Sequence, residues 1–205
     1  MNPNPIAALS RYLLTALVVA IPAAYAETSI SAFSEEPDKT MAAAHESFIN
    51  GERVKSAADI HQAAAYVKKE SEKVGADSKD AVKKSGEALD KLGDCVKDGT
   101  VKSADELKKG FASVDHALAS AWLKMAEATK KSGKDASQDL KRAGASLDAS
   151  AKWSGHELEA GAKESINAVK QAGRATGEGV KVGAEEVGGW FKGIGDGIKH
   201  LGGKL

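Results

Sequence analysis

Residues 103–131 read SADELKKGFASVDHALASAWLKMAEATKK, and this stretch decides the fold that we expect. Its apolar side chains recur every three or four residues, which places them on one face of an α-helix. Ser103 and Glu106 form a capping box at its start, in which the serine hydroxyl accepts a backbone N–H and the glutamate reaches back to the cap. The stretch therefore predicts a helix over 104–131. Its buried face comprises Leu107, Phe111, Val114, Leu118, Ala121 and Met125.

Three shorter helices are predicted before it, over 38–49, 55–73 and 77–96. The turn-forming pair Asn50-Gly51 ends the first of them. Small and apolar residues continue at heptad-like spacing through the second and third, so we expect these two helices to bury one continuous stripe. The stripe comprises Ile60, Ala64, Val67, Ser71, Val74, Ser78, Ala81, Ser85, Ala88, Leu92 and Cys95.

The fold class that we predict is all-α. We expect no strands, because no segment alternates β-branched and aromatic residues with polar ones. The connections between the helices over 38–131 are short, so neighbouring helices should run antiparallel, as helical hairpins or as a helical bundle.

The chain from Thr129 divides into blocks of eleven residues that end at Leu205. The first four blocks are TKKSGKDASQD, LKRAGASLDAS, AKWSGHELEAG and AKESINAVKQA. Eleven residues in three turns give about 3.67 residues per turn, so the first, fourth and eighth positions of each block stay on one face of a helix. We therefore predict that 132–205 forms a long, glycine-rich amphipathic helical tail. Ser154 and Glu157 predict a second capping box within it.

The second position is basic in five successive blocks, and a serine or alanine followed by a glycine occupies the fourth and fifth positions of several. This pattern over 129–205 resembles the eleven-residue repeats of late-embryogenesis-abundant proteins and of apolipoprotein-like amphipathic helices. The resemblance implies soluble helices of low stability that become ordered on drying or on a lipid surface. Glycine is denser here than in those families, and Glu185 and Asp196 replace the basic residue in the last two blocks.

The last segment is the sharpest candidate for a membrane- or partner-contacting surface. Seven apolar residues recur there at helical spacing, and two of them are adjacent aromatics: Val187, Trp190, Phe191, Ile194, Ile198, Leu201 and Leu205. Two interpretations stay open. The face can pack onto the bundle over 38–131, or it can lie in a membrane interface, where amphipathic helices with Trp and Phe bind. The surrounding charges balance, so attraction to an anionic membrane would be slight.

The N-terminus predicts export. Residues 1–26 contain Arg11, the apolar run YLLTALVVAI over 12–21 and the small-x-small site Ala24-Tyr25-Ala26, which is typical of a cleaved signal peptide. A flexible lead-in rich in Ser and Glu follows over 27–37. We therefore expect the mature protein in the periplasm or outside the cell.

Export would expose Cys95, the single cysteine, to an oxidising environment. In an oxidising compartment a lone cysteine is either buried and inert or pairs between two chains. Its place on the small-residue stripe favours a buried thiol. The alternative is an intermolecular disulfide, which would make the protein a homo-oligomer.

The composition argues against several functions. The 205 residues include 29 Lys+Arg and 29 Asp+Glu, so there is no basic excess with which to bind nucleic acid. One cysteine allows neither a disulfide framework nor a cysteine-based zinc site. None of the five histidines is followed by another at i+4, and no glycine-rich phosphate loop follows a strand. We expect no enzyme, no metal and no cofactor.

Two functions remain. The first is a non-catalytic, structural or stress-protective protein of the cell envelope, whose amphipathic helices contact membrane surfaces or other proteins. The second is a periplasmic binding or adaptor module whose helical bundle recognises a specific protein or ligand.

Overall fold

The computed structural model describes residues 35–177 and 184–205, and this part of the chain contains helices and no strand. The all-α fold class is therefore confirmed. The predicted signal peptide at 1–26 lies outside the described residues. None of the helices in the described ranges is long and apolar enough to cross a membrane. The helices are α1 (Asp38–Ile49), α2 (Arg53–Glu70), α3 (Ala76–Lys97), α4 (Ala104–Lys131), α5 (Ser137–Ser154), α6 (Ala160–Gly177) and α7 (Ala184–Gly202).

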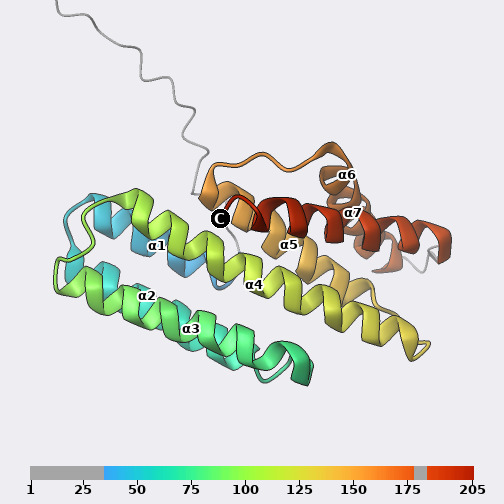
Figure 1. The fold of residues 1–205 in the computed structure, drawn as a ribbon, viewed down its shortest axis with the longest axis horizontal. Helices are drawn as coiled ribbons and strands as arrows, with labels where there is room; N and C mark the ends of the chain where they lie inside the picture. Colours follow the sequence, from blue (N-terminus) through green and yellow to red (C-terminus); the bar gives the residue numbers. More distant parts are fainter. Residues whose placement is uncertain (1–34, 178–183) are drawn as a thin grey trace, which may run out of the picture.

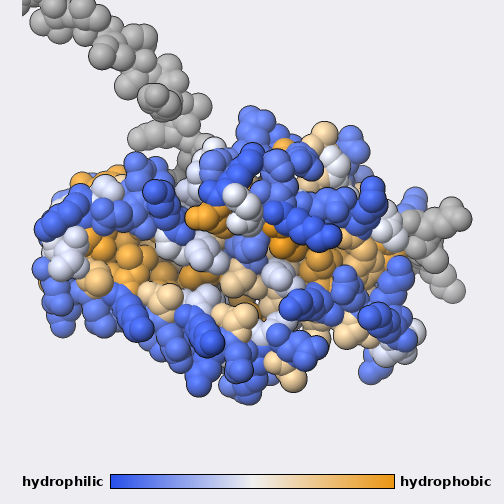
Figure 2. Space-filling model, in the orientation of Figure 1, coloured by the Kyte–Doolittle hydropathy of each residue, from blue (hydrophilic) through white to orange (hydrophobic). Residues whose placement is uncertain are grey.

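The long helix α4 runs through the middle of the bundle (Figure 1). It contacts α1 and α3 on one side and α5 and α7 on the other. Short turns join most successive helices, so neighbours run antiparallel as predicted. In Figure 2 hydrophilic side chains cover the outer edges, and apolar side chains show in the band between the helices.

The bounds of α1 and α4 agree with the sequence analysis, and local signals mark the end of α1 and the start of α4. Gly51 follows α1 with a φ of +80°, a conformation that glycine adopts without strain. At α4 the Ser103 hydroxyl accepts the backbone N–H of Glu106 at 3.3 Å. The Glu106 carboxylate accepts the N–H of Lys102 at 3.1 Å, one residue before the cap.

The second predicted capping box is wrong. Ser154 is the last residue of α5, and its hydroxyl donates to the carbonyl of Ala151 at 3.1 Å. Gly155, with a φ of +69°, ends α5, and α6 begins only at Ala160. The helix-ending glycine outweighs the Ser-x-x-Glu pattern, because Ser154 still belongs to α5 and Glu157 lies in the loop before α6.

The predicted face of α4 is confirmed. Five of its six members are buried, and Met125 is partly buried against the same core. On another side of the helix, alanines form a flat surface against α5. There the Ser150 hydroxyl donates to the backbone carbonyl of Ala112 at 2.7 Å, which requires the two helices to be close together.

The predicted stripe is correct through α2 and at Ser78 in α3, and it is wrong by one residue over the rest of α3. The turn over 71–75 interrupts the helical path, so the heptad count does not carry across it. Val82, Leu89 and Val96 are larger than the predicted Ala81, Ala88 and Cys95, and burying them removes more apolar area from water. Cys95 is therefore exposed, and the expectation that it is buried is wrong. The buried face of α3 comprises Ser78, Val82, Gly86, Leu89, Gly93 and Val96.

The described residues of 132–205 form the three helices α5, α6 and α7. Both α5 and α7 contact α4, so this region is folded back against the first part of the chain. Many first, fourth and eighth positions of the eleven-residue blocks are buried in these helices. They include Leu140, Ala143, Leu147, Ala151, Ala162, Ser165, Val169 and Ile198.

We predict that Gly193→Ala destabilises the protein by about 2 kcal/mol or more. A Cβ at Gly193 would lie 1.9 Å from the Ser165 hydroxyl and 2.7 Å from the carbonyl oxygen of Gly161, so α6 and α7 would have to separate. Thermal unfolding followed by circular dichroism measures the change.

Gly188→Ala is the matched control on the same helix. A Cβ at Gly188 meets no atom within 4 Å, so the higher helix propensity of alanine should stabilise the protein by up to about 1 kcal/mol. Equal effects of the two substitutions would contradict the close packing of α6 on α7.

Candidate functional site

The packing of α7 on the bundle explains where the predicted contact surface lies. Trp190, Ile194, Ile198 and Leu201 are buried, and Val187 and Phe191 are partly buried against the same core. Leu205 alone of the seven is well exposed, at 50%. Of the two interpretations, the packed face is the one that this arrangement favours.

Specific contacts hold α7 to α4. The Nε2–H of His116 donates to the carbonyl of Ile198 at 2.9 Å. The Lys130 ammonium lies 4.9 Å from the centre of the Phe191 ring, which is a cation–π contact. The terminal helix is therefore held by polar and apolar contacts together.

Small residues bring α7 equally close to α6. A Cβ at Gly197 would lie 2.7 Å from the Cβ of Ala162, and Gly193 faces Gly161 and Ser165 in the same way. Glycine at these positions lets the two helix backbones approach where a larger residue would hold them apart. The close contact leaves an open groove beside it.

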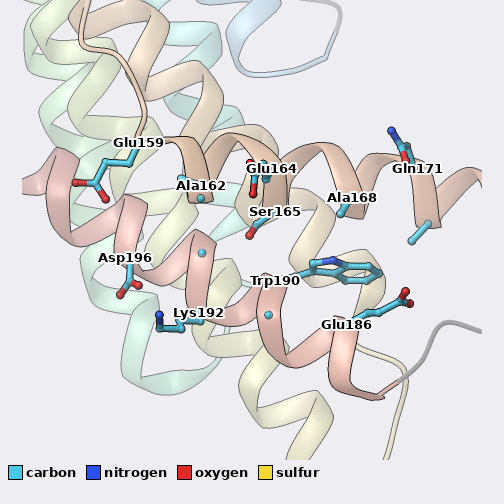
Figure 3. A pocket seen from close by; sticks show the side chains of 14 residues that line it. Glu159, Ala162, Glu164, Ser165, Ala168, Gln171, Glu186, Trp190, Lys192 and Asp196 are labelled. Carbon is cyan, nitrogen blue, oxygen red and sulfur yellow. The ribbon is translucent and has the colours of Figure 1, made fainter.

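This groove has a volume of about 730 Å³ and lies between α6 and α7 (Figure 3). Its floor consists of small residues and the side of Trp190. Charged residues from both helices stand around it, as Figure 3 shows for Glu159, Glu164, Glu186, Lys192 and Asp196. We define the α6–α7 groove by these five charged residues together with Gly161, Ala162, Ser165, Ala168, Gln171, Ala172, Gly189, Trp190 and Gly193.

The charges around the α6–α7 groove are unequal: four carboxylates stand beside one ammonium. Glu159 pairs with the imidazole of His200 at 2.9 Å. Glu164 and Asp196 are exposed and form no ion pair with the described residues. Their charges are therefore open to solvent and to a ligand.

Ser165 adds a buried polar group to the α6–α7 groove. Its side chain is 8% exposed and extends toward α7 (Figure 3). Its hydroxyl makes no hydrogen bond within the described residues. Buried polar groups usually have a partner, so this hydroxyl is available to a group that enters the groove.

A second polar cluster joins α2 to α3. His61 Nδ1 lies 3.1 Å from the Asp90 carboxylate, and Lys68 donates to the same group. Partial burial alone would raise the pKa of Asp90, but the hydrogen bonds from Lys68 and His61 outweigh it and lower the pKa. Glycines on α3 make room for this network, since a Cβ at Gly93 would lie 3.0 Å from the His61 ring. The cluster tightens a hairpin and encloses no cavity.

The deepest titratable group is Asp115 on α4, which is 0% exposed. As a carboxylate it would have no hydrogen-bond donor for either oxygen. Its nearest charged neighbour is the carboxyl group of Asp38 on α1. Asp38 also accepts the indole N–H of Trp153 on α5 at 2.9 Å. We infer that a neutral Asp115 shares its proton with Asp38, which would join three helices.

Burial sets the pKa of both acids. It raises the pKa of Asp115 well above its ordinary value, and the nearby charge of Asp38 raises it further. Burial also raises the pKa of Asp38, against the lowering effect of hydrogen bonds with Asp115 and Trp153 and of the Lys152 charge. Because Asp115 has no solvent exposure, we assign this pair to stability.

The described ranges contain no group of three or more His, Cys, Asp or Glu side chains arranged to hold a metal ion. Cys95 lies exposed on α3, where its thiol is accessible to solvent, to reagents and to a second chain.

Comparisons with known proteins give no relative. No family model matches the chain, and searches of curated proteins and of solved structures found no match.

Sequence reasoning missed both the α6–α7 groove and the acid pair. The groove brings together residues that lie about thirty positions apart in the sequence. In the sequence its charged residues follow the pattern of an ordinary solvent-exposed helix face. Helical spacing could have indicated the burial of Asp115, since it lies four residues after Phe111 and three before Leu118 on the buried side of α4.

We predict that the protein becomes less stable as pH rises and that Asp115→Asn suppresses this loss. A group whose pKa is raised by folding stabilises the fold below its ordinary pKa, here 3.8, and that stabilisation is lost as pH rises through the folded-state pKa. Asparagine keeps the shape of aspartate and donates to Asp38 at every pH. Near pH 8 the variant should be more stable than the wild type by about 1–3 kcal/mol.

Urea unfolding between pH 4 and pH 9 measures this effect. His45, Asp148 and Lys152 are the other charged or titratable groups near the pair, and they are unchanged in the variant. Asp80→Asn, an exposed substitution on α3, is the control and should keep the wild-type profile. An Asp115→Asn profile as steep as that of the wild type would contradict the shared proton.

We predict that Cys95 reacts completely with a maleimide in the folded protein, because its side chain is exposed. Mass spectrometry should show one added label without denaturant and none in Cys95→Ser. Labelling that requires denaturant would contradict the position of α3.

Proposed function

We propose that this chain is an exported, non-catalytic helical protein of the cell envelope that works as a binding module. Residues 1–26 would direct it to the periplasm or outside the cell. The α6–α7 groove would hold a segment of another protein.

The observation that carries this proposal is the open groove between α6 and α7. Its volume of about 730 Å³ falls in the range of known ligand sites. Both walls are helices, so their side chains are held in place before a partner arrives. The small residues of the floor allow a partner backbone to come close.

A second candidate is the protective function, in which α7 contacts membranes or other proteins. The half-exposed Leu205 and the partly buried Val187 and Phe191 favour it, because they leave an apolar edge of α7 near the surface. Full insertion into lipid would also require Ile194, Ile198 and Leu201 to leave the core. Each such side chain contributes about 1.5–3 kcal/mol by burial, so we place this function second.

Site-specific photo-cross-linking in intact cells tests the binding function. A benzoylphenylalanine at Gln171 inside the groove should form a discrete adduct with a partner protein, and the same group at Glu87 on α3 should not. Gly189→Trp places an indole at the groove, at a position where a Cβ meets nothing within 4 Å, and should abolish the Gln171 adduct. An adduct that survives Gly189→Trp, or no adduct at all, would overturn the proposal.

Vesicle flotation separates the two functions. If α7 stays docked, the protein should remain at the bottom of the gradient with vesicles of neutral or anionic phospholipid, and its helicity should not change. Co-flotation with an increase in helicity would favour the protective function instead.

A further inference from the structure

We propose that the occupant of the α6–α7 groove is a positively charged peptide segment of a partner protein, with lysine or arginine near both of its ends. The inference rests on the proposed binding function and adds the chemistry of the partner.

Charge complementarity is the first argument. Four carboxylates and one ammonium surround the groove, although the whole chain has 29 acidic and 29 basic residues. The acidic excess is therefore local. Glu164 and Asp196 carry no ion pair within the described part of the chain, so a cation gains their attraction without breaking an existing contact.

The positions of the carboxylates suggest the length of the segment. The groove follows α6 from Gly161 to Ala172 and α7 from Asp196 back to Glu186. At 1.5 Å per residue each wall is roughly 15 Å long. Glu159 and Asp196 stand at one end and Glu186 at the other (Figure 3). An extended peptide advances about 3.3 Å per residue, so a segment of about five residues, with a basic side chain at its first and last positions, reaches both ends.

Ser165 points to a peptide main chain as the group between those ends. The residue is only 8% exposed, its hydroxyl makes no hydrogen bond with the described residues, and it can bond to a backbone N–H or C=O. At the α4–α5 contact the same chemistry is satisfied inside the protein, where Ser150 donates to the carbonyl of Ala112. A linear polyamine would meet the carboxylates but would leave most of the 730 Å³ empty, and it offers Ser165 no carbonyl acceptor.

Fluorescence anisotropy with three labelled pentapeptides tests the inference on the intact chain. Lys-Ala-Ala-Ala-Lys should bind, and its affinity should fall as salt rises because the pairs are exposed to solvent. Gln-Ala-Ala-Ala-Gln and Glu-Ala-Ala-Ala-Glu should bind at least about fivefold more weakly.

Charge variants locate the binding. Glu164→Gln with Asp196→Asn should weaken the lysine peptide about three- to tenfold. The control is Asp80→Asn with Glu87→Gln, which removes the same charge from exposed positions on α3 and should not change the affinity. Ser165→Ala should weaken binding about two- to fivefold while leaving the melting temperature unchanged.

The results that overturn the inference are distinct. A glutamine peptide that binds as tightly as the lysine peptide would overturn the charged partner and leave the groove as a binding site. Spermine that displaces the lysine peptide and binds as tightly, with no effect of Ser165→Ala, would replace the peptide by a polyamine. No binding of the lysine peptide would overturn the inference, and the cross-linking experiment decides the binding function separately.

Discussion

Burial of α4 on several sides is the constraint on which the rest of the structure depends. Its large apolar side chains, among them Leu107, Phe111 and Leu118, are completely or almost completely buried. Its alanine surface receives α5 closely enough for Ser150 to reach the backbone of Ala112. The other helices contribute large buried side chains as well, among them Trp153, Leu140 and Leu201, and these lie against α4 or against a helix that contacts it. A loss of packing along α4 would therefore release both halves of the bundle.

The elements that the sequence predicted well are those whose signals are local. The Ser103 cap, the turn at Gly51 and the apolar spacing of α4 act within a few residues, and both α1 and α4 begin and end as predicted. The face of α3 was missed because its phase is set by a turn and by the fit of Gly86 and Gly93 against α2. The seven-residue apolar face of α7 was visible in the sequence, but its partner was not, since two packings satisfy the same pattern. The α6–α7 groove depends on how two helices cross, and the spacing of residues in the sequence does not specify that crossing.

The glycines have opposite effects at different positions in this chain. Glycine inside a helix lowers its stability by about 1 kcal/mol relative to alanine. At Gly193 and Gly197 that cost is offset, because the missing side chain allows α6 and α7 to touch. The same missing side chains leave the groove shallow and accessible to a backbone. The glycines therefore account both for the low intrinsic helicity of this region and for the open groove between α6 and α7.

The hydrogen bond between Trp153 and Asp38 also bears on the order in which the contacts of the fold form. Its two residues are 115 positions apart, whereas most helix contacts join neighbours in the chain. Local contacts form early and distant ones late, because a long loop must close first. When the chain is synthesised from its N-terminus, α1 is therefore complete long before Trp153, which bonds to Asp38, has been made. Closure between α1 and α5 is a step that has to wait for the second half of the protein.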